Sequence, residues 1–210
     1  MPEKRATPKG AGRRSVAGVL LAPGAGGSAD SPALVSLAEA VAMTGVGVDR
    51  MDFPYRLAGR RRPDAQKVLE ASVRERANAF AQRLGVGTDE LVLGGRSMGG
   101  RICSQVVAEG LSAAGLALVS YPLHPPGHPE RLRTGHFPAI EVPCLFVSGT
   151  RDAFAAPDEL ERATTAIAGR VSHVWLEGGD HGLRKHGDDA ARAVAGWLAL
   201  NFTLSGSPAG

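Results

Sequence analysis

The sequence predicts an α/β protein in which a parallel sheet of six strands is covered by helices on both faces. Six short apolar runs predict the strands, and a segment with helical patterning follows every run except the fourth. Strands buried on both faces are continuously apolar, and their alternation with helices is typical of a parallel sheet. The 28 glycines and 14 prolines suit a chain with many strand–loop–helix junctions. The predicted strands are Val16–Ala22, Val46–Met51, Leu91–Gly95, Leu116–Ser120, Pro143–Ser148 and Val171–Leu176.

Five helices are expected between and after these strands. Ser31 and Pro32 supply an N-cap and a first-turn proline for the first of them. The second is long and amphipathic, with apolar residues at helical spacing along one face. The fourth strand is followed instead by a proline- and histidine-bearing loop, Tyr121–Pro138, which is too short to form a helical lid. The expected helices are Pro32–Thr44, Ala65–Leu84, Met98–Gly110, Pro157–Ala168 and Asp188–Asn201.

The length of 210 residues favours one domain, expected over residues 15–204, between a disordered basic tail at 1–14 and a flexible tail at 205–210. The formal net charge of +3 comes from the first tail, because the chain after residue 15 carries one more acidic than basic residue. A nearly neutral body does not indicate a nucleic-acid surface.

Several other classes of protein are also disfavoured. Cys103 and Cys144 fall in elements expected to be buried, so a reducing compartment fits better than a disulfide framework. The apolar run Val16–Ala22 is too short to span a membrane. The six histidines form no metal-ligand cluster in the sequence, so neither a metal nor another cofactor is expected. We therefore expect a cytoplasmic protein with no membrane or nucleic-acid partner.

Candidate chemistry centres on Ser97, in the pattern Gly95-Arg96-Ser97-Met98-Gly99. A Gly-x-Ser-x-Gly pattern between a strand and a helix predicts a sharp, strained turn that exposes the serine hydroxyl. Chance alone yields about 0.2 such patterns in a chain of this composition, so the case depends on partners elsewhere.

Asp152 and His181 are the expected partners of this serine. Each follows a predicted strand, and the carboxyl ends of parallel strands meet at one edge of a sheet. The chain order serine, acid, histidine is that of a nucleophile with its orienting acid and its base. Asp180 is less suitable because it adjoins His181, and Asp158 suits the first turn of a helix. The other histidines are expected to be structural or to lie in loops.

The oxyanion of such a reaction needs backbone N–H donors, and Ala25 and Met98 are the candidates. Met98 follows the nucleophile directly, and Ala25 lies in the glycine loop after the first strand. The loop Pro23-Gly24-Ala25-Gly26-Gly27 could instead cradle a phosphate, but it lacks both nucleotide-binding glycine patterns.

Four residues, Phe53, Tyr55, His124 and Phe154, could line a substrate pocket, since their loops converge on the same edge; packing over the sheet end is an equally good interpretation. Arg96 and Arg101 flank the serine. Two roles are open to them: favouring an anionic substrate, or tying loops to carboxylates, the commoner role of such arginines.

Several segments together resemble a small, dienelactone-hydrolase-like group of α/β-hydrolases, over about residues 16–201. This group includes predicted bacterial hydrolases and eukaryotic relatives of the testis-expressed and non-specific-lethal-complex type. The segments that carry the resemblance are Gly94–Arg101, Phe53-Pro54-Tyr55, Tyr121–Gly127 and Gly149–Asp152.

The resemblance implies a minimal α/β-hydrolase fold without a lid domain, its strands in the order 2-1-3-4-5-6. It also implies that Ser97, Asp152 and His181 are the triad. Relatives usually carry histidine where this chain has Pro23, which bears on the shape of the Ala25 loop.

The function expected from the sequence is a serine hydrolase, carboxylesterase-like, acting on a small ester or thioester. One alternative is a binding or scaffold protein that has kept the fold and lost turnover. Another is a peptidase or acyltransferase using the same three residues.

Overall fold

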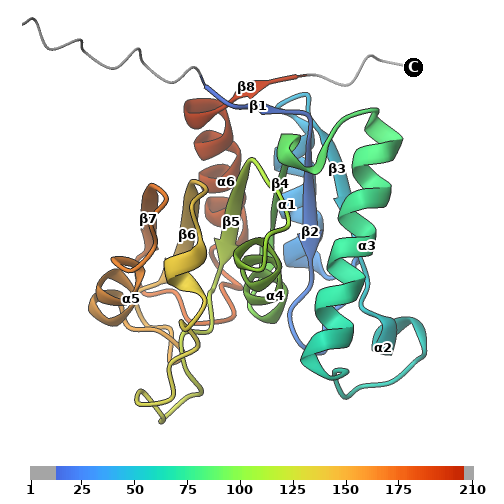
Figure 1. Cartoon of the computed structure of the whole chain (residues 1–210). Coiled ribbons are helices and arrows are strands. Elements are labelled where there is room, and N and C mark those ends of the chain that lie inside the picture. The colour runs from blue at the N-terminus through green and yellow to red at the C-terminus, as the bar shows by residue number, and fades with distance from the viewer. Residues whose placement is uncertain (1–12, 206–210) are drawn as a thin grey trace, which may run out of the picture.

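The structure is a computed structural model that describes residues 13–205. A six-stranded sheet forms its centre, every neighbouring pair of strands is parallel, and the order is β3-β2-β4-β5-β6-β7 (Figure 1). This order is the one the resemblance implied. The strands are β2 (Gly18–Ala22), β3 (Gly47–Arg50), β4 (Leu91–Arg96), β5 (Gly115–Val119), β6 (Cys144–Gly149) and β7 (Val171–Leu176).

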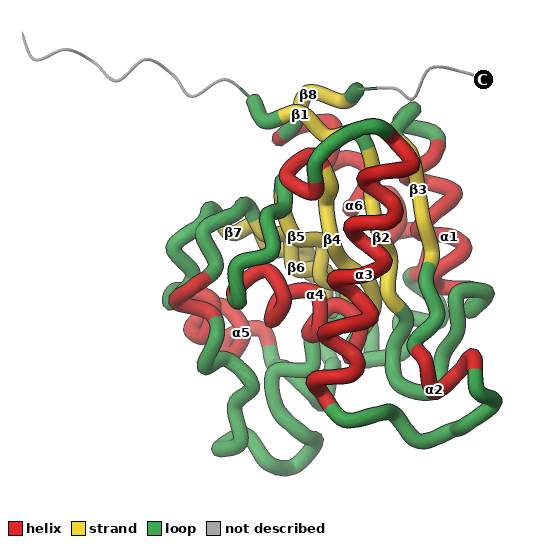
Figure 2. Tube along the Cα trace, turned by 45° about the vertical axis from the view of Figure 1, so that its right-hand side comes forward, coloured by secondary structure: helices red, strands yellow, loops and turns green. Residues whose placement is uncertain are grey.

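Helices cover both faces of the sheet, as predicted (Figure 2). One face packs against α1 (Pro32–Ala42) and α6 (Gly187–Asn201), and the other against α3 (Gln66–Leu84), α4 (Met98–Ala108) and α5 (Pro157–Thr164). Alternate residues of β2 pack into the cores on opposite faces of the sheet: Leu20 packs with α3 and α4, while Val19 and Leu21 pack with α1. This division follows from the two-residue period of a strand.

The helix ends differ from the sequence prediction by a few residues. α1 ends at Ala42, and its last turn is closed by Gly45, whose φ of +88° suits a residue without a Cβ. α5 ends at Thr164, before the close approach of Gly169 to the backbone of Val142. The structure adds short elements with too few residues for a sequence pattern: α2 (Pro54–Leu57) and two 3-10 turns, Thr88–Glu90 and Phe137–Ala139.

A second, two-stranded parallel pair joins the two ends of the described chain. β1 (Ser15–Val16) pairs with β8 (Thr203–Leu204), so the predicted first strand is divided at Ala17. The pairing extends one residue further on each side, because Thr203 N–H donates to the Arg14 carbonyl and Ser205 N–H to the Val16 carbonyl. The other residues of the two predicted tails, apart from Arg13, lie outside the described residues.

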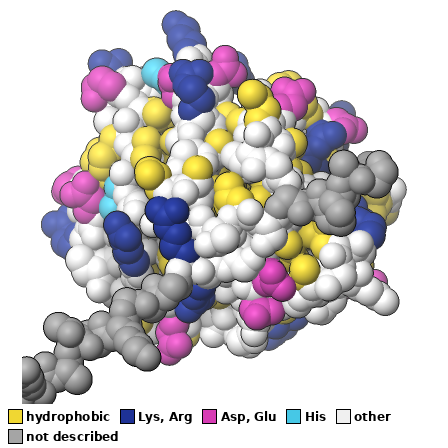
Figure 3. All heavy atoms as spheres, turned by 90° about the horizontal axis from the view of Figure 1, so that it is seen from above, with side chains coloured by type: hydrophobic (Ala, Val, Ile, Leu, Met, Phe, Trp, Pro, Cys, Tyr) yellow, Lys and Arg dark blue, Asp and Glu magenta, His cyan; other side chains and the backbone are white. Residues whose placement is uncertain are grey.

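The loops that follow the strands gather at the end of the molecule opposite β1 and β8 (Figure 1). Figure 3 looks onto the end where β1 and β8 lie, and there basic and acidic side chains are interspersed. Cys103 and Cys144 are both buried and free, and burial raises the pKa of each thiol to about 12. No helix among residues 13–205 is long and apolar enough to cross a membrane.

Candidate active site

Ser97 occupies a strained turn between β4 and α4. Its φ of 50° and ψ of −118° are unusual for a residue with a side chain. The glycines on either side make the turn possible, because a Cβ at Gly95 would lie 2.0 Å from the Ala22 carbonyl oxygen and one at Gly99 2.2 Å from it. The Ser97 N–H donates to the Val119 carbonyl at 2.8 Å, which fixes the turn to the end of β5. The strand–turn–helix expected from the sequence is therefore present.

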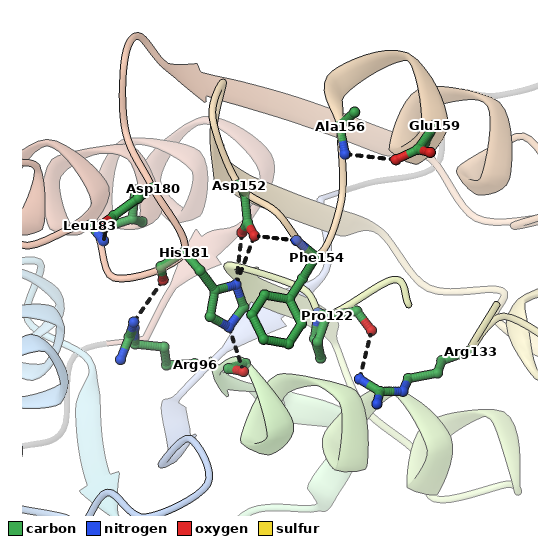
Figure 4. Close-up of polar contacts among 11 residues, drawn as sticks. Arg96, Pro122, Arg133, Asp152, Phe154, Ala156, Glu159, Asp180, His181 and Leu183 are labelled. Carbon is green, nitrogen blue, oxygen red and sulfur yellow. Dashed lines mark hydrogen bonds and ion pairs between the residues drawn. The ribbon is translucent and has the colours of Figure 1, made fainter. Parts of the chain in front are cut away.

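His181 lies between Ser97 and Asp152 (Figure 4). Its Nε2 is 2.8 Å from the Ser97 Oγ, and its Nδ1 is 3.0 and 2.8 Å from the two Asp152 carboxylate oxygens. The Asp152 side chain is fully buried, while 21% of the His181 side chain is exposed. A carboxylate only accepts hydrogen bonds, so Nδ1 carries the proton and Nε2 is free to accept from the Ser97 hydroxyl.

Two glycines allow the loops of the acid and of the histidine to meet. A Cβ at Gly149 would lie 2.1 Å from the Gly179 carbonyl oxygen, so only glycine lets the ends of β6 and β7 approach this closely. The Arg151 N–H then donates to that same carbonyl at 2.9 Å. The Phe154 N–H donates to Asp152 at 2.8 Å, and the Phe154 ring lies 4.0 Å from the His181 ring, centroid to centroid. The acid and the imidazole are thus held on several sides.

The other candidate acids have different contacts. Asp180 accepts a hydrogen bond from the Leu183 N–H at 2.9 Å and so stabilises the turn after His181, in which Leu183 has a φ of 49°. Asp158 pairs with Arg162 at 3.2 Å on the exposed side of α5. Arg96 donates to the His181 carbonyl at 2.7 Å, which ties the loop of the histidine to the end of β4 (Figure 4).

Two side chains anchor the glycine loop after β2. The Gly26 N–H donates to the Tyr55 hydroxyl at 3.2 Å, and the Ala29 N–H to Asp52 at 2.8 Å. The N–H groups of Ala25 and Met98 donate to no acceptor among residues 13–205, and both residues line the same cavity as Ser97. They are therefore free to bind an oxygen of another molecule there.

This cavity has a volume of about 380 Å³. Of the four predicted pocket residues, only Phe154 lines it. Phe53 and Tyr55 are fully buried and pack in the core beside α3, and His124 is buried between the Pro125 carbonyl and Glu159. These three side chains therefore do not line the cavity that contains Ser97. The cavity is lined by Gly24, Ala25, Arg96, Ser97, Met98, Arg101, Pro122, Arg133, Phe154 and His181.

Arg133 and Pro122 are lining residues that sequence reasoning missed. Both belong to the loop after β5, whose course no periodic pattern reveals. The Tyr121 hydroxyl donates to the Arg133 carbonyl at 2.8 Å, and the Arg133 N–H donates to the Leu123 carbonyl at 2.8 Å. These contacts fold the loop back so that residues eleven positions apart reach one cavity.

His136 is the histidine whose surroundings most strongly oppose a charge. The Ser104 hydroxyl donates to the Arg101 carbonyl and lies 2.8 Å from the His136 Nε2. Burial, reinforced by the positive charge of Arg101, lowers the pKa of His136 to about 4. His173, between Phe146 and Trp175, also has a lowered pKa because of burial.

We expect the His136→Gln variant to lose less stability in mild acid than the parent protein does. The unfolded chain binds a proton at this position below about pH 6.5, whereas the folded protein resists it down to about pH 4. The stability provided by neutral His136 is therefore complete above pH 6.5 and is lost as the pH falls toward 4. Urea unfolding gives the free energy of unfolding at pH 7.5 and at pH 4.5. The decrease between these two pH values should be smaller in the variant by about 1–2 kcal/mol, which is less than the whole pKa shift implies because His136 is partly exposed. Equal drops in both proteins would contradict this assignment.

Comparisons with known proteins agree with the fold. A family model described as an alpha/beta hydrolase domain matches residues 15–197. A protein from Xanthomonas campestris, assigned to the alpha/beta superfamily of hydrolases, is 24% identical, with a TM-score of 0.65 over 88% of this chain and 99% of that one. A dienelactone hydrolase from Anabaena variabilis is 16% identical, with a TM-score of 0.69 over 90% of this chain and 88% of that one.

Est1E from Butyrivibrio proteoclasticus is 15% identical, with a TM-score of 0.71 over 90% of each chain. At these identities the solved structures establish the shared fold, and the family model covers most of the described residues. The resemblance to small, dienelactone-hydrolase-like proteins is confirmed, and this chain belongs to the α/β-hydrolase family.

Proposed function

We propose that this chain is a serine hydrolase that cleaves a small ester or thioester through an acyl-enzyme intermediate. The observation that carries the proposal is the continuous hydrogen-bonded series from the Ser97 hydroxyl through His181 to the buried Asp152 carboxylate. Family membership supports a hydrolase, and the contacts at Ser97 suggest which kind.

The first half of the reaction transfers the acyl group to Ser97. The Ser97 oxygen attacks the acyl carbon while its proton passes to the His181 Nε2. The resulting oxyanion accepts hydrogen bonds from the Ala25 and Met98 N–H groups, an interaction that is typically worth about 10²–10³ in rate for each donor. The bond to the leaving oxygen or sulfur then breaks as His181 gives its proton to that atom.

The second half releases the acid. A water molecule loses a proton to His181 and attacks the acyl carbon, and the bond to Ser97 breaks as His181 returns the proton to it. Asp152 holds the imidazole in one tautomer and balances its positive charge throughout. The loop between β5 and β6 contains only a 3-10 turn, Phe137–Ala139, so the cavity is not covered by a helical lid. An open cavity of this size favours small acyl groups.

A fluorophosphonate probe tests the nucleophile. We expect stoichiometric labelling at Ser97, identified by peptide mass spectrometry, and complete loss of labelling in Ser97→Ala. Ser148 provides a matched control, because it is a buried serine of β6 in the same sheet, and Ser148→Ala should still be labelled. A folded parent protein that resists the probe, and that turns over no activated ester, would favour the scaffold alternative instead.

A further inference from the structure

Three arginines line the cavity that holds Ser97 and His181. Arg96 donates to the His181 carbonyl, and the other two come from different elements. Arg101 lies in the first turn of α4, four residues after Ser97, and Arg133 lies in the folded-back loop after β5. Both side chains are half-buried. Figure 4 shows Arg133 approaching the Phe154 side of the site, with its guanidinium directed toward Pro122.

Neither arginine has an acidic partner within the described part of the chain. The arginines that form ion pairs there are Arg50, Arg60, Arg74, Arg76, Arg83, Arg162 and Arg192. Arg101 has one long contact, 3.4 Å from its Nη1 to the Gln105 amide oxygen, and its buried Nε has no acceptor among residues 13–205. Arg133 likewise has one long side-chain contact, 3.4 Å to the Pro122 carbonyl. The role of tying loops to carboxylates is therefore not the one these two residues have.

The two positive charges affect each other. Burial lowers the pKa of Arg133, and the neighbouring charge of Arg101 acts in the same direction. The same charge disfavours protonation of His136. Two guanidinium groups in one cavity without a counter-ion repel each other, and a bound anion relieves that repulsion.

A guanidinium group has five N–H donors in a planar fork that fits a carboxylate through two parallel hydrogen bonds. Pro122 and Phe154 supply apolar walls in the same cavity, against which a short carbon chain can pack. The cavity therefore combines an anion-binding end, an apolar wall and the Ser97 hydroxyl.

We infer that Arg101 and Arg133 bind a carboxylate group of the substrate, so that the preferred substrates are anionic esters or thioesters. This inference rests on the proposed hydrolase activity and names its substrate class. The hydrolysed bond and the free carboxylate belong to one small molecule, with the carboxylate held between the two guanidinium groups while Ser97 attacks the ester.

Matched esters that differ in one charge test the inference. Mono-4-nitrophenyl adipate and 4-nitrophenyl hexanoate have equally long acyl chains, and only the first ends in a carboxylate. 4-Acetoxybenzoate and 4-acetoxybenzamide place the same difference on the leaving group. We expect kcat/KM at least about 10-fold higher for the anionic member of one pair, mainly through KM.

Substitutions then locate the effect. Arg101→Gln and Arg133→Gln should each reduce the preference for the anionic ester about 10-fold, and the Lys variants should restore part of it because they keep the charge without the fork. Arg131→Gln is the matched control: Arg131 is exposed, lies in the same loop and does not line the cavity, so its loss should leave both esters unaffected. Circular dichroism and thermal unfolding check that each variant is folded. An anionic preference that is absent from both pairs, or that falls equally in Arg131→Gln, would overturn the inference.

Binding to the Ser97→Ala protein separates this inference from the proposed function. Titration calorimetry with adipate should give binding that is weakened about 10-fold or more by Arg101→Gln or Arg133→Gln. Ser97-dependent hydrolysis of the neutral esters, with no binding of adipate and no anionic preference, would refute the carboxylate site alone. Arginine-dependent binding of adipate by a protein that hydrolyses none of the esters would support the site and refute the hydrolase.

Discussion

Asp152→Asn is expected to lower kcat/KM for an activated ester about 10⁴-fold, the scale of effect that follows when the acid of a serine triad loses its charge. The carboxylate accepts the His181 Nδ1 proton through both of its oxygens and is fully shielded from water. An asparagine NH₂ in that place would favour the tautomer with the proton on Nε2, and such an imidazole cannot accept a proton from Ser97. The variant keeps its size and its contact with the Phe154 N–H, so the fold should survive.

Asp180→Asn is the matched control for this prediction. Asp180 adjoins His181 in the sequence, but its carboxylate accepts a hydrogen bond from the Leu183 N–H. An asparagine oxygen can still accept that bond, so we expect a loss of less than about 10-fold. The comparison uses initial rates per folded molecule, with circular dichroism of each variant. Similar losses in the two variants would mean that the acid has been assigned to the wrong residue.

The positions of these residues could be predicted because parallel strands end at one edge. An apolar run of four to six residues indicates a buried strand, and the residue after its carboxyl end must lie at that edge. Ser97, Asp152 and His181 follow three such runs, so few assumptions were needed to predict that they lie close together. Positions 95 and 99 also require glycine for a local reason, because a side chain at either position would collide with the end of β2.

The lining of the cavity was harder to predict because it depends on how loops fold. Phe53 and Tyr55 also follow a strand, but α2 begins at Pro54 and turns both rings into the core beside α3. His124 is held by Glu159 of α5, a contact between segments 35 residues apart that no local pattern encodes. Arg133 reaches the cavity through a single loop fold held by the Tyr121 hydroxyl.

The pairing of β1 with β8 was hard to predict for the same reason, because it joins segments that are distant in the sequence. Two residues on each side are too few for a period to be recognised, and the two segments are separated by almost the whole described chain. Short-range patterns thus predicted the sheet and the residues at its strand ends, whereas the side chains that determine which substrate fits depend on contacts distant in sequence.

The close approach of Gly149 and Gly179 leads to a second large effect. Gly149→Ala should lower kcat about 10²-fold and also destabilise the protein by about 1–3 kcal/mol. The added methyl group would lie 2.1 Å from the Gly179 carbonyl oxygen, so the ends of β6 and β7 must separate. That movement carries Asp152 away from His181, because Asp152 lies three residues after Gly149 and His181 two residues after Gly179.

Gly196→Ala is the matched control for this change. Gly196 lies inside α6, where an added Cβ would meet no atom within 4 Å, so alanine should stabilise the helix by up to about 1 kcal/mol and leave kcat unchanged. Rates are divided by the number of sites that the fluorophosphonate probe titrates, so that unfolded Gly149→Ala protein does not count as slow enzyme. If the titrated sites of Gly149→Ala turn over at the parental rate, the two loops are not held in register by this contact. A reduced rate per site, together with an unaltered Gly196→Ala, would show that the missing Cβ at Gly149 sets the distance between the acid and the base.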